Sequence, residues 1–316
     1  MISRTALVSA LLYAATAAAV CTKLEDCPQF ERLNTTECQT YHHFLARGST
    51  SPYPGHVIET VGKVCDQLNT AENPNACGYE DVQYWAMNGG ERWCISSHEG
   101  ALNGAAQMRN YTERCPDSHL IVMGFSQGGS VMLDVLGGGG GPLWGCTQKD
   151  NPAMNIASAP GSKIIAAVAF GPTRRSAGMP WTHGGGEISD GGAPRTDEQN
   201  KGLQPYYNAG ILREYCQPGD PICAPHTKDK DMSKHLNYFD KWGDEAAAWV
   251  VDLARKASSK AGNGTGAGSQ TMSDGKIGGG DGGQTSDANG TKDMLKKTIS
   301  HPVSNVFVAL IVLGLL

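Results

Sequence analysis

Apolar and polar positions follow two patterns that alternate between about Cys27 and Lys256. Short apolar runs, each the length of a buried strand, predict four strands, over Tyr41 to Ala46, Val82 to Ala86, His119 to Phe125 and Ile164 to Phe170. Apolar residues three and four apart predict two amphipathic helices, over His56 to Leu68 and Phe239 to Ala257. Such alternation predicts an α/β domain with a mostly parallel sheet, whose functional loops lie at the carboxyl ends of the strands.

The first residues and the cysteines both indicate the secretory pathway. Residues 1–19 combine Arg4 with an apolar centre and a small-residue end, which predicts a signal peptide. All ten cysteines follow it, so we expect five disulfides. The cysteines show no CxxC pair or Cys/His zinc spacing, and no metal site is predicted. Four N-glycosylation sequons begin at Asn34, Asn110, Asn263 and Asn289.

The C-terminal residues predict a linker and an anchor. Residues 258–293 contain 11 glycines and few apolar side chains, which is typical of a flexible linker, so the globular domain is expected to comprise residues 20–257. The apolar terminus is too short to span a membrane. Together with the polar spacer before it, it indicates a GPI-attachment signal over residues 290–316, with attachment at Asn289 or, as a second choice, Ser286. A tail anchor and a degenerate apolar end are the alternatives.

Charge limits the class of partner. The formal net charge is −5 at pH 7, and loss of both predicted signals would remove four basic residues and one acidic residue. An acidic domain without a basic patch argues against nucleic acid as a partner. We expect a monomer that acts on a neutral substrate and meets a membrane only through its anchor.

A candidate nucleophile follows the third predicted strand. His119 to Phe125 runs into Gly124-Phe125-Ser126-Gln127-Gly128, and helix-compatible residues follow from Ser130. Gly-x-Ser-x-Gly between a strand and a helix is typical of a nucleophilic serine, and the glycines are expected to give the turn dihedrals that a side chain would forbid. The bare pattern arises by chance in about one such chain in three. The strand–turn–helix context therefore carries the prediction against a merely structural turn.

A nucleophilic serine requires a histidine that accepts its proton and a carboxylate that orients the histidine. Cys216 and Cys223 could close a small loop that holds Asp220 rigidly. Two histidines follow it. We favour His235, which precedes the last helix, and His226 in a charged loop remains the alternative.

An oxyanion requires preorganised donors. The backbone N–H of Gln127, directly after the serine, is expected to supply one. Ser49, in the loop after the first strand, is expected to supply the second through its N–H and its hydroxyl, unless this loop is an ordinary turn.

These motifs resemble the fungal cutinase and acetylxylan esterase family of α/β hydrolases. The matching stretches are Ala46 to Thr50, Cys115-Pro116-Asp117 ahead of Gly124 to Gly128, and Cys216 to Cys223 followed by His235. The resemblance extends from Cys38 to about Ala257. It implies a compact three-layer α/β hydrolase without a large lid and without a cofactor. It also implies a triad of Ser126, Asp220 and His235, oxyanion donors at Ser49 and Gln127, and the disulfides Cys38–Cys115 and Cys216–Cys223. The resemblance implies no partner for the other six cysteines, namely Cys21, Cys27, Cys65, Cys77, Cys94 and Cys146.

The chain also departs from the family pattern. The interval between Asp220 and His235 is longer than usual, which keeps His226 open. Thr173 ends a Phe-Gly-Pro-Thr stretch where acetylxylan esterases have Gly-Asp-Pro, and a polar insertion over residues 181–200 is expected to reshape the rim. The long polar segment of residues 171–215 favours the acetylxylan esterase branch, whereas the aliphatic Ile222 favours cutinases.

Two hypotheses of different class follow. The first is an extracellular serine esterase, anchored by GPI to the membrane or wall, that hydrolyses an acetylated polysaccharide or an aliphatic ester or polyester. The second is a GPI-anchored surface or wall protein that keeps a degraded hydrolase scaffold for binding.

Overall fold

A computed structural model of the protein describes residue 25 and residues 27–264, with side chains as far as residue 259. The predicted signal peptide (1–19), Cys21, Ser286, Asn289 and the GPI segment (290–316) lie outside the described residues. The Asn34 and Asn110 side chains are both exposed. None of the described helices is long and apolar enough to cross a membrane.

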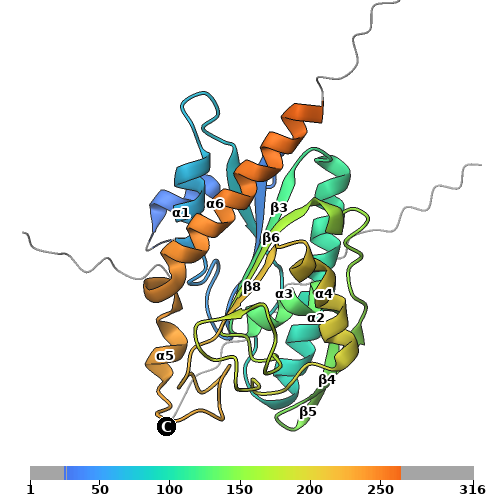
Figure 1. The fold of residues 1–316 in the computed structure, drawn as a ribbon, viewed down its shortest axis with the longest axis vertical. Coiled ribbons are helices and arrows are strands. Elements are labelled where there is room, and N and C mark those ends of the chain that lie inside the picture. The colour runs from blue at the N-terminus through green and yellow to red at the C-terminus, as the bar shows by residue number, and fades with distance from the viewer. Residues whose placement is uncertain (1–24, 26, 265–316) are drawn as a thin grey trace, which may run out of the picture. The chain divides into compact units, whose positions relative to one another are not determined.

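A six-stranded sheet forms the centre of the domain (Figure 1). Its strand order is β2-β1-β3-β6-β8-β7, and every neighbouring pair is parallel. The strands are β1 (Tyr41–Ala46), β2 (Cys77–Asp81), β3 (His119–Phe125), β6 (Ile164–Phe170), β7 (Thr182–His183) and β8 (Leu212–Tyr215). Three of them, β1, β3 and β6, match predicted strands, and they are buried on both faces as parallel strands between helix layers are.

Helices cover both faces of the sheet (Figure 1). One face carries α1 (Ile58–Leu68) and α6 (Tyr238–Gly264), and the other carries α2 (Gly90–Arg114), α3 (Gln127–Gly137) and α4 (Asp197–Asn208). The remaining elements are short, namely the helix α5 (Met232–Leu236), the hairpin β4 (Gly139–Leu143) and β5 (Cys146–Asn151), and the 3-10 turns η2 (Pro28–Leu33) and η3 (Gly161–Lys163). The three-layer α/β prediction is thereby confirmed.

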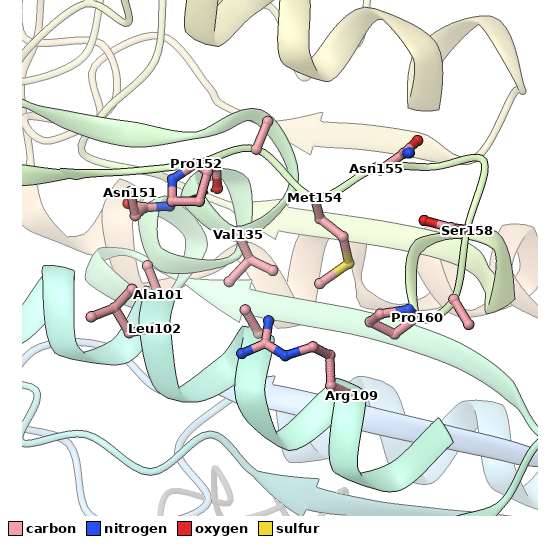
Figure 2. A pocket seen from close by; sticks show the side chains of 13 residues that line it. Ala101, Leu102, Arg109, Val135, Asn151, Pro152, Met154, Asn155, Ser158 and Pro160 are labelled. Atoms are coloured by element: carbon pink, nitrogen blue, oxygen red, sulfur yellow. Dashed lines mark hydrogen bonds between the residues drawn. The ribbon is translucent and has the colours of Figure 1, made fainter. Parts of the chain in front are cut away.

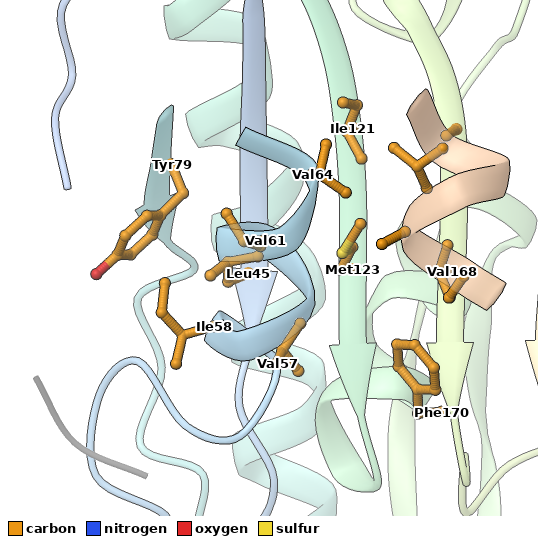
Figure 3. Packing of buried hydrophobic residues seen from close by; sticks show 14 of the residues in the cluster. Leu45, Val57, Ile58, Val61, Val64, Tyr79, Ile121, Met123, Val168 and Phe170 are labelled. Atoms are coloured by element: carbon orange, nitrogen blue, oxygen red, sulfur yellow. The ribbon is translucent and has the colours of Figure 1, made fainter. Parts of the chain in front are cut away.

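Alternation along the strands divides the core in two. Successive strand residues point to opposite faces. Leu45, Met123 and Val168 therefore pack together on the α1 and α6 face (Figure 3), while their neighbours Phe44, Val122 and Ala167 belong to the cluster under α2, α3 and α4. The central strands β3 and β6 are almost wholly apolar, which explains why they were readable as apolar runs, whereas β1 also buries His42 and His43.

Two predicted boundaries are wrong. The second strand is Cys77–Asp81, and Val82 to Ala86 leaves the sheet as a loop. Its apolar residues Val82, Tyr84 and Ala86 are buried in the cluster under α2, so burial rather than strand pairing explains the pattern. At the other end, α6 continues to Gly264, seven residues into the predicted linker, because the glycine-rich composition begins only at Gly262.

Disulfides join elements across the fold. Both bonds implied by the family resemblance, Cys38–Cys115 and Cys216–Cys223, are present. Two further bonds are Cys65–Cys77, which joins α1 to β2, and Cys94–Cys146, which joins α2 to β5. Cys27 is disulfide-bonded as well. The single cluster of possible metal ligands among the described residues combines His43 with Cys65 and Cys77, whose sulfurs are already bonded to each other.

Candidate active site

Ser126 lies in a strained turn between β3 and α3. Its φ is 57° and its ψ is −118°, a conformation that residues other than glycine rarely adopt. The surrounding main chain holds it there. The Ser126 N–H donates to the Phe170 carbonyl at 2.8 Å, and the Ser126 carbonyl accepts the Ser130 N–H at 3.1 Å. Ser126 itself is half-buried, directly after the carboxyl end of β3.

The two motif glycines have a different role from the predicted one. The residues with a positive φ include Ser126 but neither Gly124 nor Gly128, so the expected dihedral argument is wrong. A Cβ on Gly124 would collide with the Gly128 carbonyl, and a Cβ on Gly128 would collide with the Ala46 carbonyl. The glycines therefore let the first turn of α3 approach β1 and β3 closely, which fixes where Ser126 lies.

His235 is the histidine that lies beside Ser126. Its Nε2 is 2.9 Å from the Ser126 Oγ, and its Nδ1 is 2.9 Å from the Asp220 Oδ2. His235 belongs to α5, which begins at a capping hydrogen bond from the Ser233 N–H to the Asp231 side chain. The competing His226 is exposed in the preceding loop, where its backbone N–H donates to the Ser189 hydroxyl.

Asp220 accepts hydrogen bonds on both carboxylate oxygens. Oδ1 accepts the N–H groups of Ile222 at 2.7 Å and Cys223 at 3.1 Å, so the disulfide loop orients the acid from its own main chain. Burial by itself raises the pKa of Asp220, but the hydrogen bonds and charge of His235, with the bonds from Tyr238 and the Ile222 N–H, outweigh burial and hold that pKa below its usual value. The carboxylate is therefore ionised beside the imidazole.

Tyr238 is a part of this network that the sequence prediction missed. Its hydroxyl donates to the Asp220 Oδ2 at 2.7 Å and accepts the Gln217 N–H at 3.1 Å. Burial, followed by the nearby charge of Asp220, raises the pKa of Tyr238 well above its usual value, so the phenol stays a neutral donor. The available signal was a tyrosine three residues after His235, directly before the predicted helix that begins at Phe239.

Ser49 contacts Gln127, the residue directly after the nucleophile. The Ser49 hydroxyl donates to the Gln127 Oε1 at 3.1 Å, so it is engaged and does not point freely at the site as expected. Gln127 is the first residue of α3, where a backbone N–H has no partner within the helix. Its side chain is buried and donates to the Ser97 hydroxyl at 3.0 Å and to the Trp93 carbonyl at 3.2 Å. Two backbone N–H groups thus remain as candidate oxyanion donors.

Two buried arginines hold the loops around the site. Arg47 donates to the carbonyls of Ser51, Tyr84 and Trp85 at 2.7, 2.8 and 3.1 Å, which joins the Ser49 loop to the segment after β2. Arg175 pairs with Glu214 at 2.6 Å and donates to the Gly186 and Cys223 carbonyls. Arg175 thereby joins the insertion of residues 181–200 to the Cys216–Cys223 loop that contains Asp220. It lies two residues after Thr173, in the stretch that lacks the Gly-Asp-Pro carboxylate of acetylxylan esterases.

A cavity of about 320 Å³ lies between α2, α3 and the segment from Asn151 to Pro160 (Figure 2). Ala101, Val135 and Met154 form part of its apolar wall, with the Arg109 side chain beside them. None of Ser126, Asp220 and His235 lines it. This cavity is therefore separate from the candidate active site.

Comparison with known proteins agrees with this fold. The family model described as cutinase matches residues 37–254. Acetylxylan esterase 2 of Talaromyces purpureogenus is 28% identical over 218 residues, which are 67% of this chain and 86% of that protein. Cutinase 11 of Verticillium dahliae is 27% identical over 226 residues, 67% of this chain and 68% of that protein. The catalytic core domain of acetyl xylan esterase from Trichoderma reesei superposes with a TM-score of 0.55 at 24% identity, covering 69% of this chain and 100% of that one, which supports the fold.

Proposed function

This chain belongs to the cutinase family of serine carboxylic-ester hydrolases, and we propose that it works through a catalytic triad of Ser126, His235 and Asp220 and an acyl-enzyme. The observation that carries the proposal is the unbroken chain of contacts at 2.9 Å from the Ser126 Oγ through His235 to Asp220. Proton transfer requires contacts of this length.

The chemical steps follow from these contacts. The Ser126 Oγ attacks the ester carbonyl while its proton passes to the His235 Nε2, and Asp220 stabilises the imidazolium through Nδ1–H. The N–H groups of Ser49 and Gln127 stabilise the negative oxygen of the tetrahedral intermediate. His235 returns the proton to the departing alcohol. Water then attacks the acyl-enzyme carbonyl while its proton passes to His235. His235 returns the proton to the Ser126 Oγ, which releases the acid and regenerates the serine.

The decisive experiment replaces Ser126 by alanine and measures hydrolysis of p-nitrophenyl acetate. We expect kcat to fall by about 10⁴-fold or more, with an unchanged circular dichroism spectrum. Retained turnover would refute the triad. The alternative of a degraded, binding-only scaffold predicts that the wild-type protein is folded but is not labelled by an organophosphonate probe, whereas the triad predicts stoichiometric labelling at Ser126.

We propose an acetylated polysaccharide as the substrate class. Support comes from the relatives named acetylxylan esterase. A second candidate is an aliphatic ester or polyester, which the half-buried aliphatic Ile222 beside the acid favours. Initial rates on p-nitrophenyl esters from acetyl to palmitoyl, compared with acetylated xylan and a polyester, distinguish the two.

We also propose that the mature protein is an extracellular, glycosylated monomer with a GPI anchor. Its disulfides and the exposed sequon residues Asn34 and Asn110 are compatible with this route. Release of the protein from intact cells by a phosphatidylinositol-specific phospholipase, with a mobility shift after endoglycosidase treatment, is the expected outcome. Loss of release after substitution of Asn289 but not of Ser286 would identify the attachment residue.

A further inference from the structure

The turn of the β4–β5 hairpin carries a residue that its geometry disfavours. Leu143 pairs with Cys146, so Trp144 and Gly145 form a two-residue turn, and their φ values are 46° and 84°. Two-residue turns with both φ values positive strongly prefer Asn-Gly or Gly-Gly. A bulky first residue is strained there. The Trp144 side chain is 52% exposed, so core packing does not account for it either.

The hairpin that presents Trp144 is anchored on several sides. The Cys94–Cys146 disulfide joins it to α2 directly beside the turn. A small separate core packs beneath it, formed by Trp93, Cys94, Leu143, Cys146 and Ala193. From the opposite side, buried Arg174 donates to the Gly141 and Pro142 carbonyls at 2.5 and 3.3 Å. A residue carried on a backbone fixed in this way needs less ordering when a ligand binds, which is the property of a preorganised platform.

The ring lies beside the main chain that supports the active site. One edge of Trp144 lies against Gly192, where a Cβ would collide with the ring, and the Gly192 N–H donates to the Ile222 carbonyl at 3.0 Å, two residues beyond Asp220. On the other side, Trp144 meets Trp93 edge to face at 6.2 Å, and the Trp93 carbonyl accepts the Gln127 side chain. The hairpin and α5 lie at the same end of the domain (Figure 1).

We propose that Trp144 is a stacking platform for a sugar ring of the polysaccharide chain whose ester is bound at Ser126. This inference rests on the proposed esterase function and specifies its substrate. A planar indole face suits the C–H face of a pyranose ring, since aromatic walls with a few polar neighbours are typical of ligand sites. The exposed side chains of β5 beside the turn are polar, namely Thr147, Lys149 and Asp150. Sugar hydroxyls can hydrogen-bond to such groups, whereas an alkyl chain would only desolvate them.

The test measures binding without turnover. In a Ser126→Ala background, the affinity for soluble acetylated xylan is measured by affinity electrophoresis before and after Trp144→Asn. Asparagine suits the turn, so folding is retained, and we expect the affinity to fall at least tenfold. Trp144→Phe keeps a ring and should restore most of the affinity. Leu102→Ala, which removes an exposed apolar residue from the middle of α2, is the matched control and should leave the affinity at the wild-type value.

Two results would overturn the inference. The first is an unchanged polysaccharide affinity in a folded Trp144→Asn protein. The second is a loss of activity on long-chain esters with retained activity on acetylated xylan when Trp144→Asn is made in the active enzyme, which would make Trp144 an alkyl platform. Because binding is read in the Ser126→Ala protein, it can fail while p-nitrophenyl acetate hydrolysis by the wild type still supports the triad. The two proposals are therefore separately testable.

Discussion

Ser126 and Trp144 are both non-glycine residues with a positive φ, 57° and 46°, but their surroundings are opposite. Around Ser126 the main chain is hydrogen-bonded on both sides and the hydroxyl is bonded to His235. Around Trp144 the anchoring contacts act on the hairpin, through the Cys94–Cys146 bond and Arg174, and leave half of the ring exposed. The turn at Ser126 is therefore held by its own main-chain hydrogen bonds, and the turn at Trp144 is held through the neighbouring strands.

The difference indicates two uses of a strained turn. At Ser126, the group that would accept the proton is His235, which is also bonded to Asp220 in the hydrogen-bond network beside the turn. A change in this network therefore affects both catalysis and stability. At Trp144, the supporting contacts and the exposed face are separate, so recognition can change while the fold persists. Substitutions at and around the two turns can break or sharpen this contrast.

The largest effect is expected at the base. Replacing His235 by alanine removes the group 2.9 Å from the Ser126 Oγ, and kcat for p-nitrophenyl acetate should fall by about 10⁴-fold or more. His226→Ala is the matched control, because His226 is exposed, and its rate should stay within about twofold of wild type by the same comparison. A larger loss in the His226 variant would reverse the assignment of the base.

The next effect is on folding of the Ser126 turn. Gly128→Ala would drive a methyl group into the Ala46 carbonyl, so we expect the free energy of unfolding to fall by about 2–4 kcal/mol, measured by urea denaturation. Gly243→Ala in α6 is the control, because its Cβ has room there and alanine favours a helix by about 1 kcal/mol. Equal stability of the two variants would contradict the close-packing role of Gly128.

Tyr238→Phe should have an intermediate effect that depends on pH. The lowered pKa of Asp220 means that its ionised form stabilises the fold above the unfolded-state pKa of about 3.9, and that this stability is lost as pH falls through the lower folded-state pKa. Loss of the Tyr238 hydroxyl should raise the folded-state pKa and reduce this contribution. We expect about a tenfold lower kcat and a loss of about 1–2 kcal/mol in unfolding free energy at neutral pH.

The control for Tyr238→Phe is Tyr206→Phe, whose hydroxyl donates to the Met154 carbonyl at 2.9 Å, away from Asp220. Melting temperatures of both variants are measured from pH 3 to 7. Tyr206→Phe should lower the melting temperature by a similar amount at every pH. If Tyr238→Phe does the same, with an unchanged kcat, the hydroxyl has no positioning role for Asp220.

The smallest effect is expected at the hairpin turn. Trp144→Asn relieves the strained turn and should raise the free energy of unfolding by about 0.5–1 kcal/mol. Trp144→Phe keeps a bulky residue at a positive φ and should give no such gain. Differential scanning calorimetry of the two variants would measure this difference. A clear loss of stability in Trp144→Asn would mean that the ring is held by packing, and the contrast between the two turns would disappear.

Local patterns predicted the central part of the fold and missed its edge. The strands β3 and β6 are almost wholly apolar because both faces are covered, and β1 keeps four apolar residues beside the buried His42 and His43, so a single sequence window identifies all three. Strand β8, between β6 and the two-residue edge strand β7, contains Arg213 and the buried Glu214, whose charge is paired with Arg175 from another segment. No window around Leu212–Tyr215 contains that partner, and the strand was therefore not predicted.

By itself, the sequence determined the position of the candidate nucleophile and the loop that holds the candidate acid. Both depend on residues within one short stretch, Gly124 to Gly128 or Cys216 to Cys223, whose local geometry follows from spacing. Only the tertiary structure decided which histidine lies beside Ser126, why Gly124 and Gly128 are glycines, and that Tyr238 bonds to Asp220. His235 and Ser126 are 109 residues apart, and such contacts depend on how the sheet and helices pack. The same packing places the exposed Trp144 against Gly192, whose N–H donates to the Ile222 carbonyl in the loop of the candidate acid.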